Sequence, residues 1–474
     1  MYGPPPDPRQ ILAPVQMVDD PWSHLACILG GLALSALAVA WKRPPRALRY
    51  LVFIVGQVTA LTAPLLFHIN RFVYGSFPTI DKEGSLLFYL DGVHIRMVSN
   101  PLLSPADPAA RLIGVHVGHL WVTQFFDLFL TPLGAFNAQA FLSLVLGWWV
   151  MWLLLRRVCE ADRIALLLSF PFGMGLHVFR DLNWYTIEKA AIFWLPLFAL
   201  TLLRAWKDGG RWRWIPGIVF LAMSWMNLYM GMIAGFLASA AWLWLLADGI
   251  RRRERTKALR RLSHAGAVCL LMVAPLLLWQ WVLMRGGPQL GTPERFLWER
   301  AALDGFSLVP LAWNRLEVHR SLNLIGVGLA LFGVVGSWSD RRVRFALVVG
   351  ILAMLISVGP ILLPGPVENP LYMAIRWVVP GFWRVAKPEV FFHITWMLML
   401  CVASIQLAKV GSRRGVSILY GIFILAWLVM VRTHPAYPPM SQPINSNLST
   451  GWQDAVFDDE AHEPDSPDTL NTTP

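Results

Sequence analysis

The chain has 474 residues, of which 56% are hydrophobic, 15% are charged and 24 are tryptophan. A soluble protein this apolar would expose large sticky patches, so the composition excludes an ordinary soluble enzyme and favours a helical membrane protein. The net charge of +11 lies mainly in short connections between apolar runs, which indicates membrane topology and membrane lipids as partners, and no nucleic acid.

Apolar runs of roughly spanning length follow a proline-rich, irregular arm at residues 1–23. A helix needs about 20 apolar residues to cross a bilayer. We therefore predict an all-α fold, a polytopic transmembrane helical bundle of about 12 spans within residues 24–432. The predicted spans are 24–41, 51–68, 135–155, 164–178, 190–203, 215–228, 230–247, 264–284, 322–338, 345–363, 390–408 and 416–431.

Lysine and arginine concentrate in every second connection. Because basic residues are retained on the cytoplasmic side, this alternation predicts a sidedness. Both termini would then be non-cytoplasmic, in a protein of the bacterial inner membrane. The basic segments are 42–49, 156–163, 204–213, 251–261, 341–344 and 409–414.

The other connections are mostly longer, and chain of this length outside a membrane usually carries function. Within the first, residues 120–133 are apolar but interrupted by polar residues and proline, which predicts an interfacial helix. The tail at 433–474 is acidic and is expected to be disordered. The predicted external connections are 69–133, 177–189, 285–321 and 364–389.

Four runs resemble the GT-C superfamily of membrane glycosyltransferases, and more narrowly its YfhO-like bacterial branch. Asn100–His119 resembles a proline-and-glycine segment before an amphipathic helix. Phe126–Arg157 resembles a Pro-Leu-Gly start of a span with a nearby asparagine. Trp194–Gly231 resembles a Pro-Leu span, a basic turn and a Tyr-ended span, and Arg376–Leu398 resembles a late external run of the form P-G-x-x-R-x-x-(R/K)-P-x-x-F.

The resemblance implies a GT-C-like fold and transfer of a sugar from a lipid-phosphate-linked donor on the external face, by a metal-assisted, inverting displacement. It implies that Asp81 acts as the base or as a ligand of a divalent metal, Mg²⁺ or Mn²⁺. The sequence departs from the family in its additional first span and at Lys387, where a second arginine is usual. The donor sugar and the protein partners are unknown.

The carboxylates of the external connections are the candidate catalytic and metal-binding groups. A base must take a proton from the acceptor hydroxyl, and Asp81 or Asp91 could do so. Asp181 and Glu188 would complete a metal or acceptor site if their connection approaches Asp81. The alternative for each is a solvated loop charge, which is how we interpret Glu83.

Three basic residues lie in or near the late external run, Arg376, Arg384 and Lys387. A guanidinium group binds phosphate oxygens in a bidentate manner, and lysine adds a point charge. They predict a site for the donor phosphate, although head-group anchoring would need no specificity. We expect an outward-facing pocket with Asp81 on one wall and Arg384 on the other.

Two further functions fit the sequence. A transporter or flippase of a lipid-linked substrate would need ionisable groups within the spans, where His393 and His68 are the main candidates. A catalytically silent scaffold subunit would explain the departures from the family pattern. His116 and His119 could join a metal site, but interfacial histidines account for them more simply.

Overall fold

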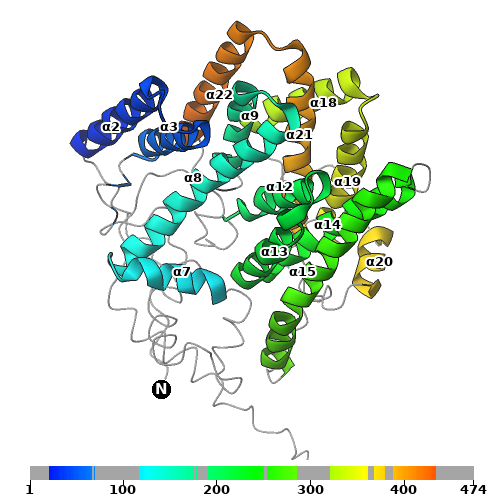
Figure 1. Cartoon of the computed structure of the whole chain (residues 1–474). Helices are drawn as coiled ribbons and strands as arrows, with labels where there is room; N and C mark the ends of the chain where they lie inside the picture. The colour runs from blue at the N-terminus through cyan, green and yellow to red at the C-terminus, as the bar shows by residue number, and fades with distance from the viewer. Residues whose placement is uncertain are drawn as a thin grey trace, which may run out of the picture.

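The computed structural model describes residues 21–63, 65–66, 69, 117–175, 178, 191–249, 253–285, 321–360, 368–378 and 388–433. Its regular elements are helices (Figure 1). They are α2 (Pro21–Ala40), α3 (Arg46–Leu61), α7 (Val117–Asp127), α8 (Pro132–Cys159), α9 (Asp162–Gly173), α12 (Trp194–Lys207), η2 (Gly210–Arg213), α13 (Ile215–Met226), α14 (Leu228–Gly249), α15 (Arg253–Arg285), α18 (Ser321–Ser337), α19 (Arg341–Val358), α20 (Pro370–Val378), η4 (Pro388–Phe391), α21 (Phe392–Val410) and α22 (Arg413–Thr433).

Each predicted span overlaps one of these helices. By length and composition, five helices of the described residues could cross a bilayer, and they support an integral membrane protein. The count of about 12 spans and the orientation of the termini remain predictions. The five spanning stretches are Pro21–Ala40, Gly134–Cys159, Tyr229–Ala247, Leu259–Leu278 and Phe392–Val410.

Helices α8 and α21 form the centre of the bundle. In their spanning stretches 67% and 72% of the residues are buried, against 28% in α2 and in α15. Helix α8 runs through the middle of the molecule, and α2 lies at its edge against α3 (Figure 1). A helix that is apolar all round but exposed on one side suits lipid contact, so α2 and α15 are peripheral and α8 and α21 form the core.

The turn from α8 to α9 makes these two helices antiparallel neighbours. Glu160 ends α8 in a left-handed conformation, with φ 58°, a common way to close a helix. At the far end of α9, Gly173 lies directly against the backbone of Trp148. Helix α9 ends there rather than continuing to residue 178 as predicted, two residues after Pro171, which lacks a helical donor.

Replacing Gly173 by alanine should destabilise the fold. A Cβ atom at this position would overlap the backbone nitrogen of Trp148, and overpacking of this kind costs about 1–3 kcal/mol. The melting temperature of the detergent-solubilised protein should fall. Gly266→Ala in α15 is the matched control, because a Cβ there meets no atom within 4 Å. Equal melting temperatures for the two variants would contradict the close α8–α9 packing.

The basic segments meet at one end of the bundle, around the C-terminus of α8. Arg156 and Arg46 both contact Asp162, at 2.8 and 3.6 Å. Arg157 pairs with Asp208 beyond α12, at 2.8 Å. Exposed ion pairs contribute only about 0–1 kcal/mol each, so helix packing brings these segments together and the ion pairs mark where they meet.

The remaining basic segments join the same end through hydrogen bonds. Arg342 donates to the carbonyl of Val158 at 2.9 Å, and Arg261 donates to the carbonyl of Lys207 at 3.0 Å. The Lys409 ammonium donates to the Ser337 hydroxyl at 2.8 Å. All six basic segments therefore lie at one end, here called the basic end, as the alternation of charge predicted.

Candidate functional site

The described part of the bundle holds one of the predicted site residues, Arg376. The others lie outside the described residues, so their predicted convergence on a single pocket stays a prediction. They are Asp81, Asp91, Asp181, Glu188, Arg384 and Lys387. Among the described residues no group of three or more His, Cys, Asp or Glu side chains could hold a metal ion.

Arg376 lies on α20, a short helix between α19 and α21 that was not predicted. This helix packs against α19, and Tyr372 is its buried residue. Arg376 is half-buried, whereas the neighbouring Trp377 is 85% exposed. Because α20 follows the C-terminus of α19, Arg376 lies at the end of the bundle opposite the basic end.

A buried amide fixes the start of α20. Asn369 donates to the carbonyls of Leu355 and Gly359, at 2.7 and 2.8 Å, and its side-chain oxygen accepts from the backbone of Tyr372. Gly359 has φ 92°, in the region that favours glycine, and ends α19. These bonds hold α20, and with it Arg376, against the end of α19.

A second polar cluster joins α7 to α8 at the same end. The Gln139 amide donates to Nδ1 of His119 at 2.9 Å and accepts from the Thr123 hydroxyl at 2.8 Å. All three side chains are buried. His119 therefore joins α7 to α8 from a buried position, and its predicted metal role remains a prediction. The predicted helix at 120–133 corresponds to α7, which also packs against α13.

Two more asparagines secure chain segments at this end. Asn137 in α8 donates to the carbonyl of Ile69 at 2.7 Å, across 68 positions of sequence. Asn227 separates α13 from α14 and accepts from the backbone of Tyr229 at 2.8 Å. Both asparagines are fully buried, and a buried amide is stabilising only when it is hydrogen-bonded. Asn137 thus holds the chain at the start of the first long connection, and Asn227 fixes the short turn from α13 to α14.

His393, the intramembrane residue expected of a transporter, is buried near the start of α21. The surrounding helices are closely packed, since the neighbouring Phe391 meets Phe236 of α14 with ring centroids 5.7 Å apart. His68, the other candidate, lies outside the described residues. His393 is thus buried near the end of α21 that lies opposite the basic end.

At the basic end, Asp340 caps α19 and contacts Arg342. Its carboxylate accepts from the Arg342 backbone at 2.8 Å and pairs with the guanidinium at 2.8 Å. The hydrogen bond from the Arg342 side chain holds the pKa of Asp340 below its usual range, against the opposing effect of burial. The same bond raises the pKa of Arg342.

Asp340→Ala should lower the free energy of unfolding by about 0.5–2 kcal/mol at neutral pH, the usual cost of a lost helix cap. Since the folded-state pKa is depressed, the stabilisation is complete above the unfolded value and is lost as pH falls through the folded value. The gap between wild type and variant should therefore narrow below about pH 4, to the contribution of a neutral cap. Thermal unfolding across pH measures this. Asp340→Asn, which keeps a capping oxygen, should lose less, and a pH-independent gap would contradict the assignment.

The arrangement of helices is similar to that of solved structures of a mycobacterial enzyme. The cryo-EM structure of arabinofuranosyltransferase AftD from mycobacteria matches with a TM-score of 0.50 and 12% identity, over 86% of this chain and 29% of that chain. A structure of a mutant of that enzyme matches with a TM-score of 0.44 and 11% identity, over 86% and 30%. The likeness is one of fold: this chain is similar in fold to the matched part of AftD.

The present chain spans less than a third of the length of AftD. The similarity supports the GT-C-like fold expected from the sequence, but not a specific YfhO-like member. No protein-family model matches the chain. No curated protein matches it either.

The buried amides that hold this end together were not predicted from the sequence. Asn137 appeared only as the asparagine of a resembling run, and Gln139 and Asn369 were not singled out. A single amide within an apolar run is the available signal, because burying it requires partners. The partners themselves lie up to 68 positions away and cannot be identified from that signal.

Proposed function

We propose that this protein is a membrane glycosyltransferase-like enzyme that takes its sugar from a lipid-phosphate-linked donor, at the end of the bundle opposite the basic end. The GT-C-like fold carries this proposal. The gathering of the six basic segments supports it, because the long connections with the candidate residues leave from helix ends on the opposite side.

In the proposed reaction, the carboxylate of Asp81 takes the proton of an acceptor hydroxyl. The acceptor oxygen forms a bond to the anomeric carbon of the sugar, and the bond from that carbon to the donor phosphate breaks. The phosphate leaves with the bonding electrons, and Arg384 and Lys387 stabilise its charge. Base and cations must lie on opposite sides of the anomeric carbon for this displacement.

Asp81, Asp181 and Glu188 would hold a divalent ion in this proposal. Their carboxylate oxygens are the donors that Mg²⁺ and Mn²⁺ prefer. Such an ion would supply further charge stabilisation for the departing phosphate. Arg376, which α20 presents at the same end, would contact the donor phosphate or its neighbouring lipid head groups.

The test is sugar transfer by the purified full-length protein in proteoliposomes. The donors are polyprenyl phosphates carrying radiolabelled pentoses or hexoses, offered with a panel of glycan and lipid acceptors. We expect label in an acceptor and an equal amount of free polyprenyl phosphate. Movement of the intact donor across the bilayer without transfer would instead favour a transporter. Absence of both, with stable co-purifying proteins, would favour a scaffold subunit.

A further inference from the structure

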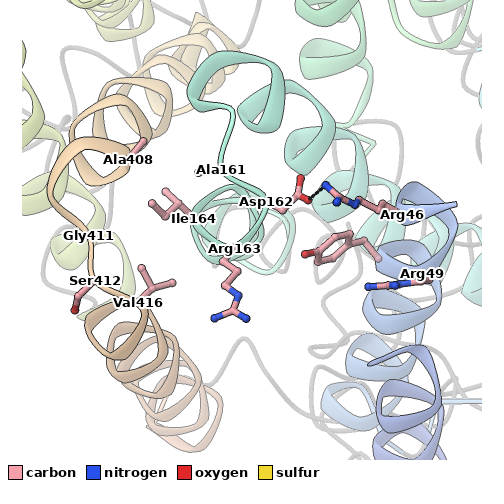
Figure 2. Close-up of a pocket in the computed structure, with 11 residues that line it drawn as sticks. Arg46, Arg49, Ala161, Asp162, Arg163, Ile164, Ala408, Gly411, Ser412 and Val416 are labelled. Atoms are coloured by element: carbon pink, nitrogen blue, oxygen red, sulfur yellow. Dashed lines mark ion pairs between the residues drawn. The ribbon is translucent and has the colours of Figure 1, made fainter. Parts of the chain in front are cut away.

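A pocket of about 580 Å³ opens at the basic end, the end of the bundle opposite the one to which we assign the proposed reaction. The first turns of α3, α9 and α22 line it (Figure 2). Arg46 and Arg49 come from α3, Arg163 comes from α9, and Ser412 precedes α22. Three helices far apart in sequence thus bring their N-terminal ends to one cavity.

The positive charge of this pocket is only partly neutralised. The carboxylate of Asp162 in the lining is already paired with Arg156, at 2.8 Å, and more distantly with Arg46. In the described part of the chain, Arg49 and Arg163 have no carboxylate partner. Figure 2 shows Arg46 reaching towards Asp162, while Arg49 and Arg163 extend into the space between the helices.

Arg49 is half-buried and, like Arg157 and Arg213 elsewhere at the basic end, has an unsatisfied side-chain donor. Its Nε atom is buried and, among the described residues, has no hydrogen-bond partner. A buried charged donor without an acceptor is costly. An anion in the pocket would supply the missing acceptor. A phosphate suits a guanidinium group because two of its oxygens can accept two parallel N–H bonds from it.

The helix ends add to the attraction. Neither α3 nor α9 has a side-chain hydrogen bond at its N-cap, which is Pro45 in one and Ala161 in the other. The first N–H groups of a helix lack partners within it and carry partial positive charge, so helix N-termini favour phosphate groups. Here they reinforce the arginines, whereas Ser412 caps α22 through a bond from Gly415.

Apolar side chains lie beside the arginines of the pocket. Ile164 and Val416 line the cavity. Helix α2, which packs against α3, exposes Leu37 and Val39 in its last turn, at 54% and 66%. A ligand with its phosphate between the arginines could therefore place an acyl chain against these side chains, which a soluble phosphate compound would not use.

We propose that this pocket binds the phosphate of an anionic phospholipid head group. Arg49 and Arg163 hold the phosphate oxygens, and the apolar side chains of the pocket and of the last turn of α2 contact the acyl chain. The lipid thereby links α2–α3, which lie at the edge of the bundle, to α9 and α22. The site is separate from sugar transfer, and its test does not depend on the transfer assay.

The test is equilibrium binding of a fluorescent short-chain phosphatidylglycerol to the full-length protein in zwitterionic detergent. Arg49→Gln/Arg163→Gln should weaken binding by about tenfold or more, as expected for two basic groups beside an anionic head group. Lys257→Gln/Arg344→Gln removes the same charge from exposed positions in the basic segments, outside the pocket, and should leave binding nearly unchanged. Arg49→Lys/Arg163→Lys keeps the charge but cannot make bidentate hydrogen bonds, so this variant should bind with intermediate affinity.

Equal weakening in the two glutamine double variants would overturn the proposal, because a general surface potential would then explain the binding. Equally tight binding of phosphatidylcholine would also overturn it. Glycerol 3-phosphate should displace the lipid poorly, and displacement as effective as that by unlabelled phosphatidylglycerol would assign the pocket to a soluble phosphate. Should the glutamine variant unfold, the lysine variant decides, and wild-type affinity in it would contradict the bidentate role.

Discussion

Asp81→Asn is expected to lower the rate of sugar transfer by about 10²–10⁴-fold, the usual contribution of a general base. Asparagine keeps the size of the side chain but cannot accept the proton of the acceptor hydroxyl. The measurement is the initial rate in the proteoliposome assay, with expression and melting temperature compared with wild type. A metal-ligand role for Asp81 predicts a loss that added Mn²⁺ or Mg²⁺ partly restores.

The control for Asp81 is Glu83→Gln, two positions further along the chain. We interpret Glu83 as a solvated charge, so its replacement should leave the rate nearly unchanged. Transfer at the wild-type rate by Asp81→Asn would remove Asp81 from the mechanism. If instead Asp91→Asn abolished transfer while Asp81→Asn did not, the base would be the second candidate.

Arg384→Ala should lower kcat/KM for the lipid-linked donor by about 10²–10³-fold, as is typical when a donor to a developing anion is removed. Arg384→Lys should retain part of the activity, because it keeps a point charge without the bidentate geometry. Lys387→Ala should have a smaller effect. The dissociation constant of the donor and kcat are measured separately. Weaker donor binding with unchanged kcat indicates a contact in the ground state, whereas a lower kcat indicates a contact made in the transition state.

The charge-matched control for Arg384 is Arg344→Ala, an exposed residue of the basic end. It removes the same charge from the opposite end of the bundle and should leave kcat/KM unchanged. Similar losses in the two variants would indicate a general effect of charge and not a phosphate site.

The sidedness of the bundle could be predicted because it is encoded locally. Each basic turn, such as 156–163, is recognisable by itself, and alternation along the chain then places all of them at one end. Helix ends were harder to predict. Helix α3 begins at Arg46 rather than residue 51, since hydropathy excludes the basic first turn that lines the pocket. Helix α9 ends early where Gly173 meets Trp148.

The contacts that build the sites could not be predicted, because they join residues distant in sequence. The bond from Asn137 to Ile69 spans 68 positions, and the pocket brings Arg49 of α3 near Arg163 of α9 and Ser412 before α22. Arg49 and Arg163 count equally as topology signals in the sequence. Only the packing of three helix N-termini distinguishes them from the other cations around them.

The proposed reaction requires the basic end to face the cytoplasm and the opposite end, with the candidate residues, to face outside. Single cysteines at Lys257 and at Trp377, both exposed, test it when labelled by a membrane-impermeant maleimide in right-side-out vesicles. The native cysteines, all buried or half-buried, would first be replaced by alanine; they are Cys27, Cys159, Cys269 and Cys401. We predict that Trp377→Cys is labelled in intact vesicles and Lys257→Cys only after permeabilisation. Labelling of both from one side, or the reverse pattern, would contradict the account.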